Sequence, residues 1–165
     1  MAKLSKEEIL NLKEGLNEVF IELENNNSAF NDFYNNPIEF FNRFKITSLN
    51  YLSNYNSLKD RLTFAIRDAI RDAIGQFGRI VSSCLICKTT VLLIIFGTLG
   101  KTAVLWEGVL ASINFIKDGV KEYFELTSNE IDRIFNALDR RTNNITPSHL
   151  AFQICINLGH CQRRI

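Results

Sequence analysis

The chain has 165 residues, of which 46% are hydrophobic and 22% are charged, and its 19 Lys and Arg residues nearly balance its 18 Asp and Glu residues. A formal net charge of +1 gives no basic excess of the kind that nucleic-acid binding requires, so we expect no nucleic-acid partner. A chain of this length buries about 70% of its unfolded surface, which is enough to enclose a central helix. We therefore expect a single domain over residues 1–165.

The first predicted helix begins near Ser5 and Glu8, which have the spacing of an N-terminal capping box. The segment MAKLSKEEILNLKEGL has acidic residues where a secretory signal has an apolar core, so we expect no targeting peptide and a cytoplasmic location. Its apolar residues form one broad stripe, which is typical of a surface helix packed on a core. They are Leu4, Ile9, Leu12, Leu16, Val19, Phe20 and Leu23.

Residues 25–56 are rich in Asn and aromatic residues, in short runs such as FNDFYNN and PIEFFNRFKI. Asn favours caps and turns over helix interiors, so we expect short helices and turns in this segment. Pro37 and Pro147 each follow a residue suited to cap a helix, which places both prolines in the first turn of a helix.

A longer helix is predicted from Ser57 and Asp60, again at capping-box spacing, through the tetrad repeat AIRDAIRDAI at 65–74. The repeat places its Ile and Ala residues on two neighbouring lines along the helix. We interpret the opposite, charged face as solvated and crossed by weak ion pairs. It consists of Arg67, Asp68, Arg71 and Asp72.

The run from Ile80 to Gly100 is apolar nearly all the way round a helix, and we expect it to end at a break between Gly97 and Gly100. A helix without a polar face is buried on all sides, either by lipid or by other helices. Lys88 lies in the middle of the run and would cost about 3 kcal/mol in a membrane. We therefore expect the run to be the buried centre of a soluble bundle.

A second, milder apolar helix is predicted over 101–126, so that residues 76–124 form a helical hairpin. Thr127 and Glu130 then repeat the capping-box spacing before another short helix. Helix signals follow one another along the chain without a strand pattern or a domain linker. The predicted class is all-α: a bundle in which amphipathic helices wrap a central buried hairpin.

Four cysteines form two sets, CLIC at 84–87 and the pair Cys155 and Cys161 near the end of the chain. The CLIC spacing resembles half of a metal knuckle, which Cys155, His160 and Cys161 would complete. Cys84 and Cys87 fall within a predicted helix, however, and unpaired Cys is among the most buried residue types. We therefore interpret all four as buried thiols, and we expect neither a metal site nor a cofactor.

Catalytic patterns are weak in this chain. His149 and His160 are not arranged with a nucleophile, and His149, shortly after Pro147, is interpreted as a helix-start residue. The segment GQFGR lacks the Lys-Ser/Thr of a phosphate-binding loop. Asp68 and Asp72 alternate with arginines, so ion pairing explains them without acid–base chemistry. We do not expect an enzyme.

The segment RLTFAIRDAIRDAIGQFGRIVSSCLI, within 61–87, resembles the fourth helix and first homology motif of the Bcl-2 family of apoptosis regulators. The family signature is Asn-Trp-Gly-Arg-Ile/Val, opening a buried central helix. In this chain Gln76 stands for the Asn, Phe77 stands for the Trp, and residues 78–81 match outright. The stretch LTFAIRDA is also similar to divergent poxvirus members of the family.

This sequence departs from the family pattern in several places. One extra residue separates Asp72 from Gly78, and Phe77 cannot donate the hydrogen bond of an indole. No second homology motif with its Trp stands near 120–140, and no death motif with Gly-Asp precedes Leu58. The last of these favours a pro-survival over a pro-death protein. The C-terminal segment AFQICINLGHCQRRI is too short and too polar for a membrane anchor.

The resemblance implies a pro-survival regulator that binds the amphipathic death-motif helices of pro-apoptotic proteins in a hydrophobic groove. It implies that Arg79 pairs with the Asp of such a ligand, through bidentate hydrogen bonds, and that Gly78 lets the ligand helix approach. It leaves open a homodimer, a host–virus setting, and attachment to the mitochondrial outer membrane through a partner. The other implied ligand-binding residues are Ala65, Asp68, Ala69, Gln76, Phe77, Val81, Ser82 and Ile86.

Two other functions are compatible with the pattern. A membrane-active, pore-forming bundle would hide the hairpin 80–124 in water and insert it into a bilayer. A leader-peptide-like recognition module would use residues 28–50 and carry CINLGHC as its modified part. A structural bundle without a partner is the remaining alternative.

Overall fold

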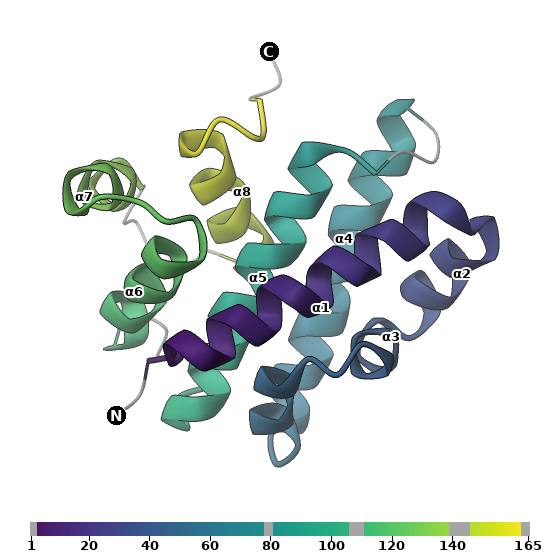
Figure 1. The fold of residues 1–165 in the computed structure, drawn as a ribbon, viewed down its shortest axis with the longest axis horizontal. Coiled ribbons are helices and arrows are strands. Elements are labelled where there is room, and N and C mark those ends of the chain that lie inside the picture. The colour runs from purple at the N-terminus through teal and green to yellow at the C-terminus, as the bar shows by residue number, and fades with distance from the viewer. Residues whose placement is uncertain (1–2, 78–80, 106–110, 139–145, 163–165) are drawn as a thin grey trace.

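The structure is a computed structural model that describes residues 3–77, 81–105, 111–138 and 146–162, with the backbone alone described for 74–77. Over these ranges the secondary structure is helical, without a strand. The predicted all-α class is therefore confirmed. Figure 1 shows the helices gathered around one central helix, α5.

The N-terminal third forms three α-helices and a 3₁₀ helix: α1 (Lys6–Asn25), α2 (Asn27–Asn35), α3 (Pro37–Arg43) and η1 (Thr47–Leu52). The capping box is present, because the Ser5 side chain accepts from the Glu8 N–H and the Glu8 side chain accepts from the Ser5 N–H. Pro37 occupies the first turn of α3, as predicted. The Asn-rich segment is thus short helices and turns, and buried phenylalanines of α2 and α3 pack their rings together.

The charged repeat lies in α4 (Asn56–Phe77), which is longer than predicted. It begins one residue before Ser57 and continues past Gly75. A single glycine costs about 1 kcal/mol in a helix interior, and that cost alone does not end a helix. The helix therefore extends beyond the repeat at 65–74 and ends at Phe77.

The apolar run forms α5 (Ser83–Thr102), which begins three residues later than Ile80 and ends beyond Gly100. The Ser82 side chain caps it by accepting from the Leu85 N–H. The predicted break at the glycines is wrong, because they serve close packing. A Cβ added at Gly97 would lie 3.3 Å from the Cβ of Ser48, so glycine lets η1 approach the central helix.

The remaining helices are α6 (Ile113–Tyr123), α7 (Ser128–Asn136) and α8 (Pro147–Asn157). The predicted continuous helix over 101–126 is wrong, because Ala103 adopts the left-handed conformation (φ 59°) that terminates α5. The capping box at Thr127 and Glu130 and the helix start at Pro147 are confirmed.

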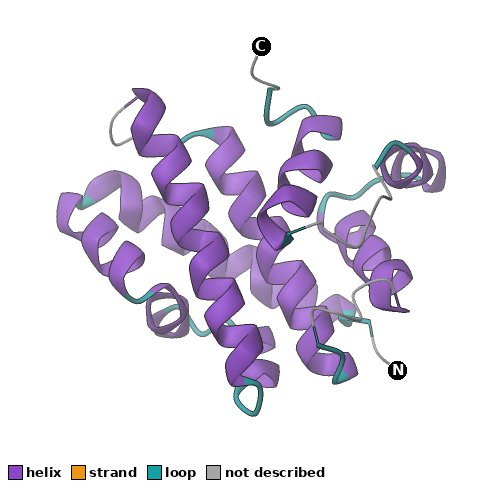
Figure 2. Ribbon diagram, turned by 180° about the vertical axis from the view of Figure 1, so that it is seen from behind, coloured by secondary structure: helices purple, strands orange, loops and turns teal. Residues whose placement is uncertain are grey.

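Helix α5 is the core of the protein. It contacts α8, η1, α4 and α6, and α1 crosses in front of it, as Figure 1 shows. Figure 2 shows the same arrangement from behind, where α4 runs across the bundle beside α5. The segment has the length and mean hydropathy (1.8) of a membrane span, but 83% of it is buried inside the protein. The prediction of a helix enclosed by other helices is confirmed.

Candidate functional site

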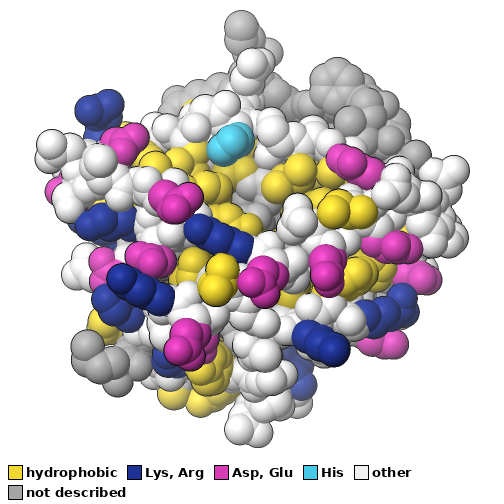
Figure 3. Space-filling model, in the orientation of Figure 1, with side chains coloured by type: hydrophobic (Ala, Val, Ile, Leu, Met, Phe, Trp, Pro, Cys, Tyr) yellow, Lys and Arg dark blue, Asp and Glu magenta, His cyan; other side chains and the backbone are white. Residues whose placement is uncertain are grey.

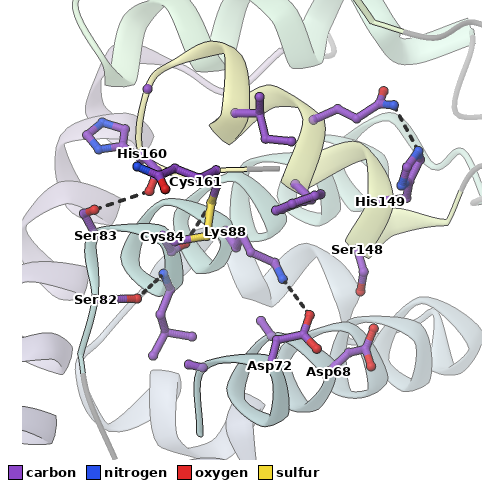
Figure 4. Close-up of a pocket in the computed structure, with 18 of the residues that line it drawn as sticks. Asp68, Asp72, Ser82, Ser83, Cys84, Lys88, Ser148, His149, His160 and Cys161 are labelled. Carbon is purple, nitrogen blue, oxygen red and sulfur yellow. Dashed lines mark hydrogen bonds and ion pairs between the residues drawn. A yellow bond between two sulfur atoms is a disulfide. The ribbon is translucent and has the colours of Figure 1, made fainter. Parts of the chain in front are cut away.

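A cavity of about 1150 Å³ lies between α4, the first turns of α5, and α8 with the segment that follows it. In Figure 4, side chains from all three converge on this space. The cavity opens to the surface. On the face drawn in Figure 3, acidic and basic side chains are interspersed, with hydrophobic side chains visible between them. This face is therefore neither uniformly positive nor uniformly negative.

Helix α4 forms one wall with residues at i, i+4 spacing. Asp68 and Ala69, two of the residues implied by the resemblance, line this wall together with Asp72 and Ala73. Ser82, a third, lines the cavity at the start of α5. The small side chains of the alanines leave room next to the backbone of α4.

Three other implied residues lie outside the cavity lining. Ala65 is 2% exposed and packs in the core, one turn before Ala69. Val81 and Ile86 are half-buried hydrophobic residues packed against the core. The resemblance therefore indicates the right elements, but only part of the lining.

The signature itself lies mostly outside the described residues. Gly78, Arg79 and Ile80 are not described, and the backbone of Gln76 and Phe77 forms the last turn of α4. The predicted contact between Arg79 and a ligand carboxylate remains a prediction. What the structure gives is the position of the two helices that this junction connects, and both line the cavity.

Lys88 brings a buried positive charge to the cavity. Its side chain is 7% exposed, and its Nζ lies 3.3 Å from Oδ2 of Asp72, whose side chain is 58% exposed. The same ammonium lies 5.4 Å from the centre of the Phe152 ring, a distance at which the ring face attracts a cation. Figure 4 shows the lysine and aspartate reaching toward each other across the cavity.

The charged face of α4 is exposed at Arg71 and Asp72, as predicted, but its polar contacts reach other helices as well. Asp72 pairs with Lys88 of α5 instead of an arginine of its own helix. The Nε of Arg67 donates to the carbonyl oxygen of Tyr34 at 2.8 Å and so ties α4 to the end of α2. Asp72 and Arg67 have partners on other helices because α5 and α2 pack directly against α4.

The interpretation of the cysteines as unpaired thiols is also wrong. Cys84 is bonded to Cys161, and Cys87 is bonded to Cys155, with Cα–Cα distances of 4.7 and 5.9 Å. The i, i+3 spacing puts both cysteines of α5 on one face, and the reversed order of their partners shows that α8 runs antiparallel to α5. By the chain-entropy estimate, one such bond closing a loop of this length stabilises the fold by about 4 kcal/mol.

The two histidines, His149 and His160, both line the cavity. The His149 N–H donates to the Thr146 hydroxyl, so the prediction of a helix-start residue is confirmed. Nε2 of His149 lies 3.0 Å from Nε2 of Gln153. The ring of His160 packs against Phe124 with centroids 6.3 Å apart.

Comparisons with protein-family models, with curated proteins and with solved structures found no match to this chain. The site therefore has to be judged from its own geometry. It offers small and apolar side chains along the helices, a buried cation, and carboxylates at the rim. Such a surface offers contacts to both the apolar and the polar face of an amphipathic partner. The sequence did not identify Lys88 or the paired cysteines as part of the site. The available signals were a single lysine within an apolar run and two cysteines in each of two segments.

Proposed function

We propose that this protein is a Bcl-2-like regulator of apoptosis that promotes survival by binding the amphipathic death-motif helices of pro-apoptotic proteins. The binding site is the cavity between α4, α5 and α8. The observation that carries the proposal is that the motif-like segment 61–87 supplies two of its walls, through Asp68 and Ala69 on α4 and Ser82 before α5.

The architecture supports the proposal. A long apolar helix enclosed by amphipathic helices is the layout that the family resemblance implies, and α5 has it. The cavity volume of about 1150 Å³ exceeds the roughly 300–1,000 Å³ of small-molecule pockets. A groove of that size accommodates several side chains of a helix, read at i, i+3/i+4 and i+7.

In this account the apolar face of the ligand helix packs over Ala69, Ala73 and Leu85. Arg79, at the junction between α4 and α5, pairs with the ligand's aspartate through two charge-assisted hydrogen bonds. Gly78 lets the ligand backbone come close. Asp68 and Asp72 face the polar flank of the ligand, where basic side chains are favoured.

The proposed setting is the cytoplasm, including the cytoplasmic face of the mitochondrial outer membrane, and the proposed partners are pro-apoptotic proteins. Disulfides persist in oxidising compartments and are reduced by cytosolic thiols. In the proposed setting, the two disulfides can therefore be either oxidised or reduced.

A membrane-active, pore-forming bundle is the second candidate, and the length and hydropathy of α5 favour it. The two functions make different demands on Arg79. A groove binder depends on its guanidinium, whereas a pore former tolerates its loss. The leader-peptide alternative has less support, since four of the five phenylalanines in 28–50 are buried in the common core.

The proposal is tested by titrating the purified protein into a panel of fluorescent death-motif peptides. The tightest pair is measured again with Arg79→Ala, Gly78→Glu and the control Arg133→Ala on the exposed surface of α7. We expect submicromolar binding that the first two changes weaken by about tenfold, or about 1.4 kcal/mol, and that the control leaves unchanged. Absence of binding to every peptide, or equal binding by all variants, would refute the proposal, and liposome leakage would then test the second candidate.

A further inference from the structure

We infer that the Cys84–Cys161 bond is a thiol–disulfide exchange site on the cavity wall, open to a small dithiol, and that Cys87–Cys155 is its protected structural counterpart. The two bonds join the same pair of segments but differ in their surroundings. Figure 4 shows the bond between Cys84 and Cys161 beside Ser82 and Ser83, at the end of the cavity where α5 begins.

Access separates the two bonds. Both Cys84 and Cys161 line the cavity; Cys84 is half-buried, and Cys161 is 5% exposed. Cys87 is 2% exposed and Cys155 is 0% exposed, and neither of them lines the cavity. Exchange requires a thiolate to reach a sulfur atom, so a dithiol entering the cavity meets the outer bond first.

The position of Cys84 also favours its release. Ser82 caps α5, and Cys84 is the second residue of the helix. The unpaired N–H groups and partial positive charge of a helix N-terminus stabilise a thiolate, and a stabilised thiolate is a good leaving group. Lys88 adds a positive charge one turn later on the same helix. Cys87 is one turn into the helix and is packed in the core.

The exchange then runs in two balanced steps. One thiolate of the dithiol attacks the sulfur of Cys161, the Cys84–Cys161 bond breaks, and Cys84 leaves with the electron pair and takes a proton from water. The second thiol of the reductant, deprotonated by solvent, attacks the mixed disulfide and releases Cys161, which is protonated in turn. The protein gains two electrons and two protons, and the dithiol becomes a disulfide.

Once that bond is open, the segment after α8 is held by hydrogen bonds back to α8, by a hydrogen bond from Ser83 and by the packing of the His160 ring on Phe124. The Ser83 hydroxyl donates to the His160 carbonyl oxygen at 3.3 Å, and the N–H of His160 donates to the Cys155 carbonyl oxygen at 2.9 Å. The inner bond still ties α8 to α5. Reduction therefore removes the covalent link between the cavity wall at 158–162 and α5, which loosens that wall and leaves the helix in place. Its effect on ligand entry rests on the proposed function; the exchange itself does not.

The exchange site is tested on the oxidised full-length chain with graded dithiothreitol. Samples are alkylated at intervals, and mass spectrometry then identifies the labelled cysteines. We expect Cys84 and Cys161 to be labelled about tenfold or more faster than Cys87 and Cys155 at a dithiothreitol concentration that leaves the fold intact. Equal labelling rates, or labelling only when the protein unfolds, would overturn the inference.

The release of the wall is tested by hydrogen exchange of 158–162 in the variant Cys84→Ser/Cys161→Ser, with Cys87→Ser/Cys155→Ser as the matched control. We expect faster exchange in this segment in the first variant, with α8 still protected, and the same change in reduced wild-type protein. Unchanged exchange of 158–162 in both the Cys84→Ser/Cys161→Ser variant and the reduced wild-type protein would overturn the predicted effect on the cavity wall. Binding of the peptide panel is then measured in the oxidised and in the reduced protein, and we expect tighter binding after reduction. Absence of binding in both states would contradict the proposed function. The exchange site is tested independently, by the labelling rates of the four cysteines.

Discussion

Glu8 of α1 and Lys101 of α5 form an ion pair at 2.6 Å in which both side chains are largely buried, with 15% and 21% of their surfaces exposed. The Tyr51 hydroxyl donates to the other carboxylate oxygen, Oε2, and the Ser5 N–H donates to Oε1 as part of the capping box. One carboxylate thus joins α1, η1 and the C-terminal end of α5. The disulfides fix the opposite end of α5, so the central helix is held at both ends.

Replacing Glu8 with Gln should destabilise the fold. The change leaves the ammonium of Lys101 partly buried without a counter-charge, which we expect to lower the free energy of unfolding by about 1–3 kcal/mol. Urea denaturation at neutral pH measures the effect. The control is Glu14→Gln on the exposed face of α1, which should change stability by less than about 0.5 kcal/mol. Equal effects of the two changes would show that the pair contributes nothing.

The same carboxylate gives the stability a defined pH dependence. Burial acts to raise the pKa of Glu8, but the hydrogen bonds from Lys101, Ser5 and Tyr51 outweigh it and lower the pKa from 4.5 to about 2. Since the folded state holds the proton less tightly than the unfolded state, this contribution is complete above about pH 4.5 and is lost as the pH falls toward 2. Urea denaturation between pH 6 and 2 should therefore show a steeper loss for wild type than for Glu8→Gln. Parallel curves would contradict the assignment.

Ala103 offers a stabilising substitution. It ends α5 with φ 59°, a left-handed conformation in which the Cβ of a non-glycine residue is crowded. Ala103→Gly should raise the free energy of unfolding by about 1 kcal/mol. Ala137→Gly is the matched control, because Ala137 ends α7 with φ −80° and gains nothing from glycine. A destabilised Ala103→Gly variant would contradict the observed backbone at this position.

The pair of Lys88 and Asp72 should respond asymmetrically to mutation. Asp72→Asn leaves a buried ammonium without its counter-charge and should cost about 1–3 kcal/mol. Lys88→Met removes the buried charge, keeps the apolar stem, and leaves an aspartate that is already exposed to water. We expect it to be neutral or stabilising. Thermal denaturation of both variants measures the difference, and a larger loss for Lys88→Met than for Asp72→Asn would contradict this account of the ion pair.

Local signals in the sequence predicted much of the fold. The central helix could be identified because its residues are apolar on every side, and the starts of α1, α7 and α8 because their capping residues act within one turn. Features that depend on distant contacts could not be identified in this way. Gly97 and Gly100 resemble a break in the sequence, and only their contact with η1 shows that they serve packing.

The candidate site was less predictable than the fold. Pairing of Cys84 with Cys161 depends on the direction in which α8 crosses α5, and no local pattern fixes that direction. The sequence marked Lys88 as costly in a membrane, but its partner depends on the register between α4 and α5. Asp68, Ala69 and Ser82 were indicated by the motif-like segment alone, and they do line the cavity.

The most direct test of the central claim is amide chemical-shift mapping of the isotopically labelled protein with the tightest-binding death-motif peptide. The account predicts that the largest shifts fall on residues that line the cavity, with Asp68, Ala69 and Leu85 among them, and that the α1 end of the bundle near Glu8 is unaffected. Saturable shifts confined to other surfaces, or none at any peptide concentration, would contradict the claim that the cavity between α4, α5 and α8 binds an amphipathic helix.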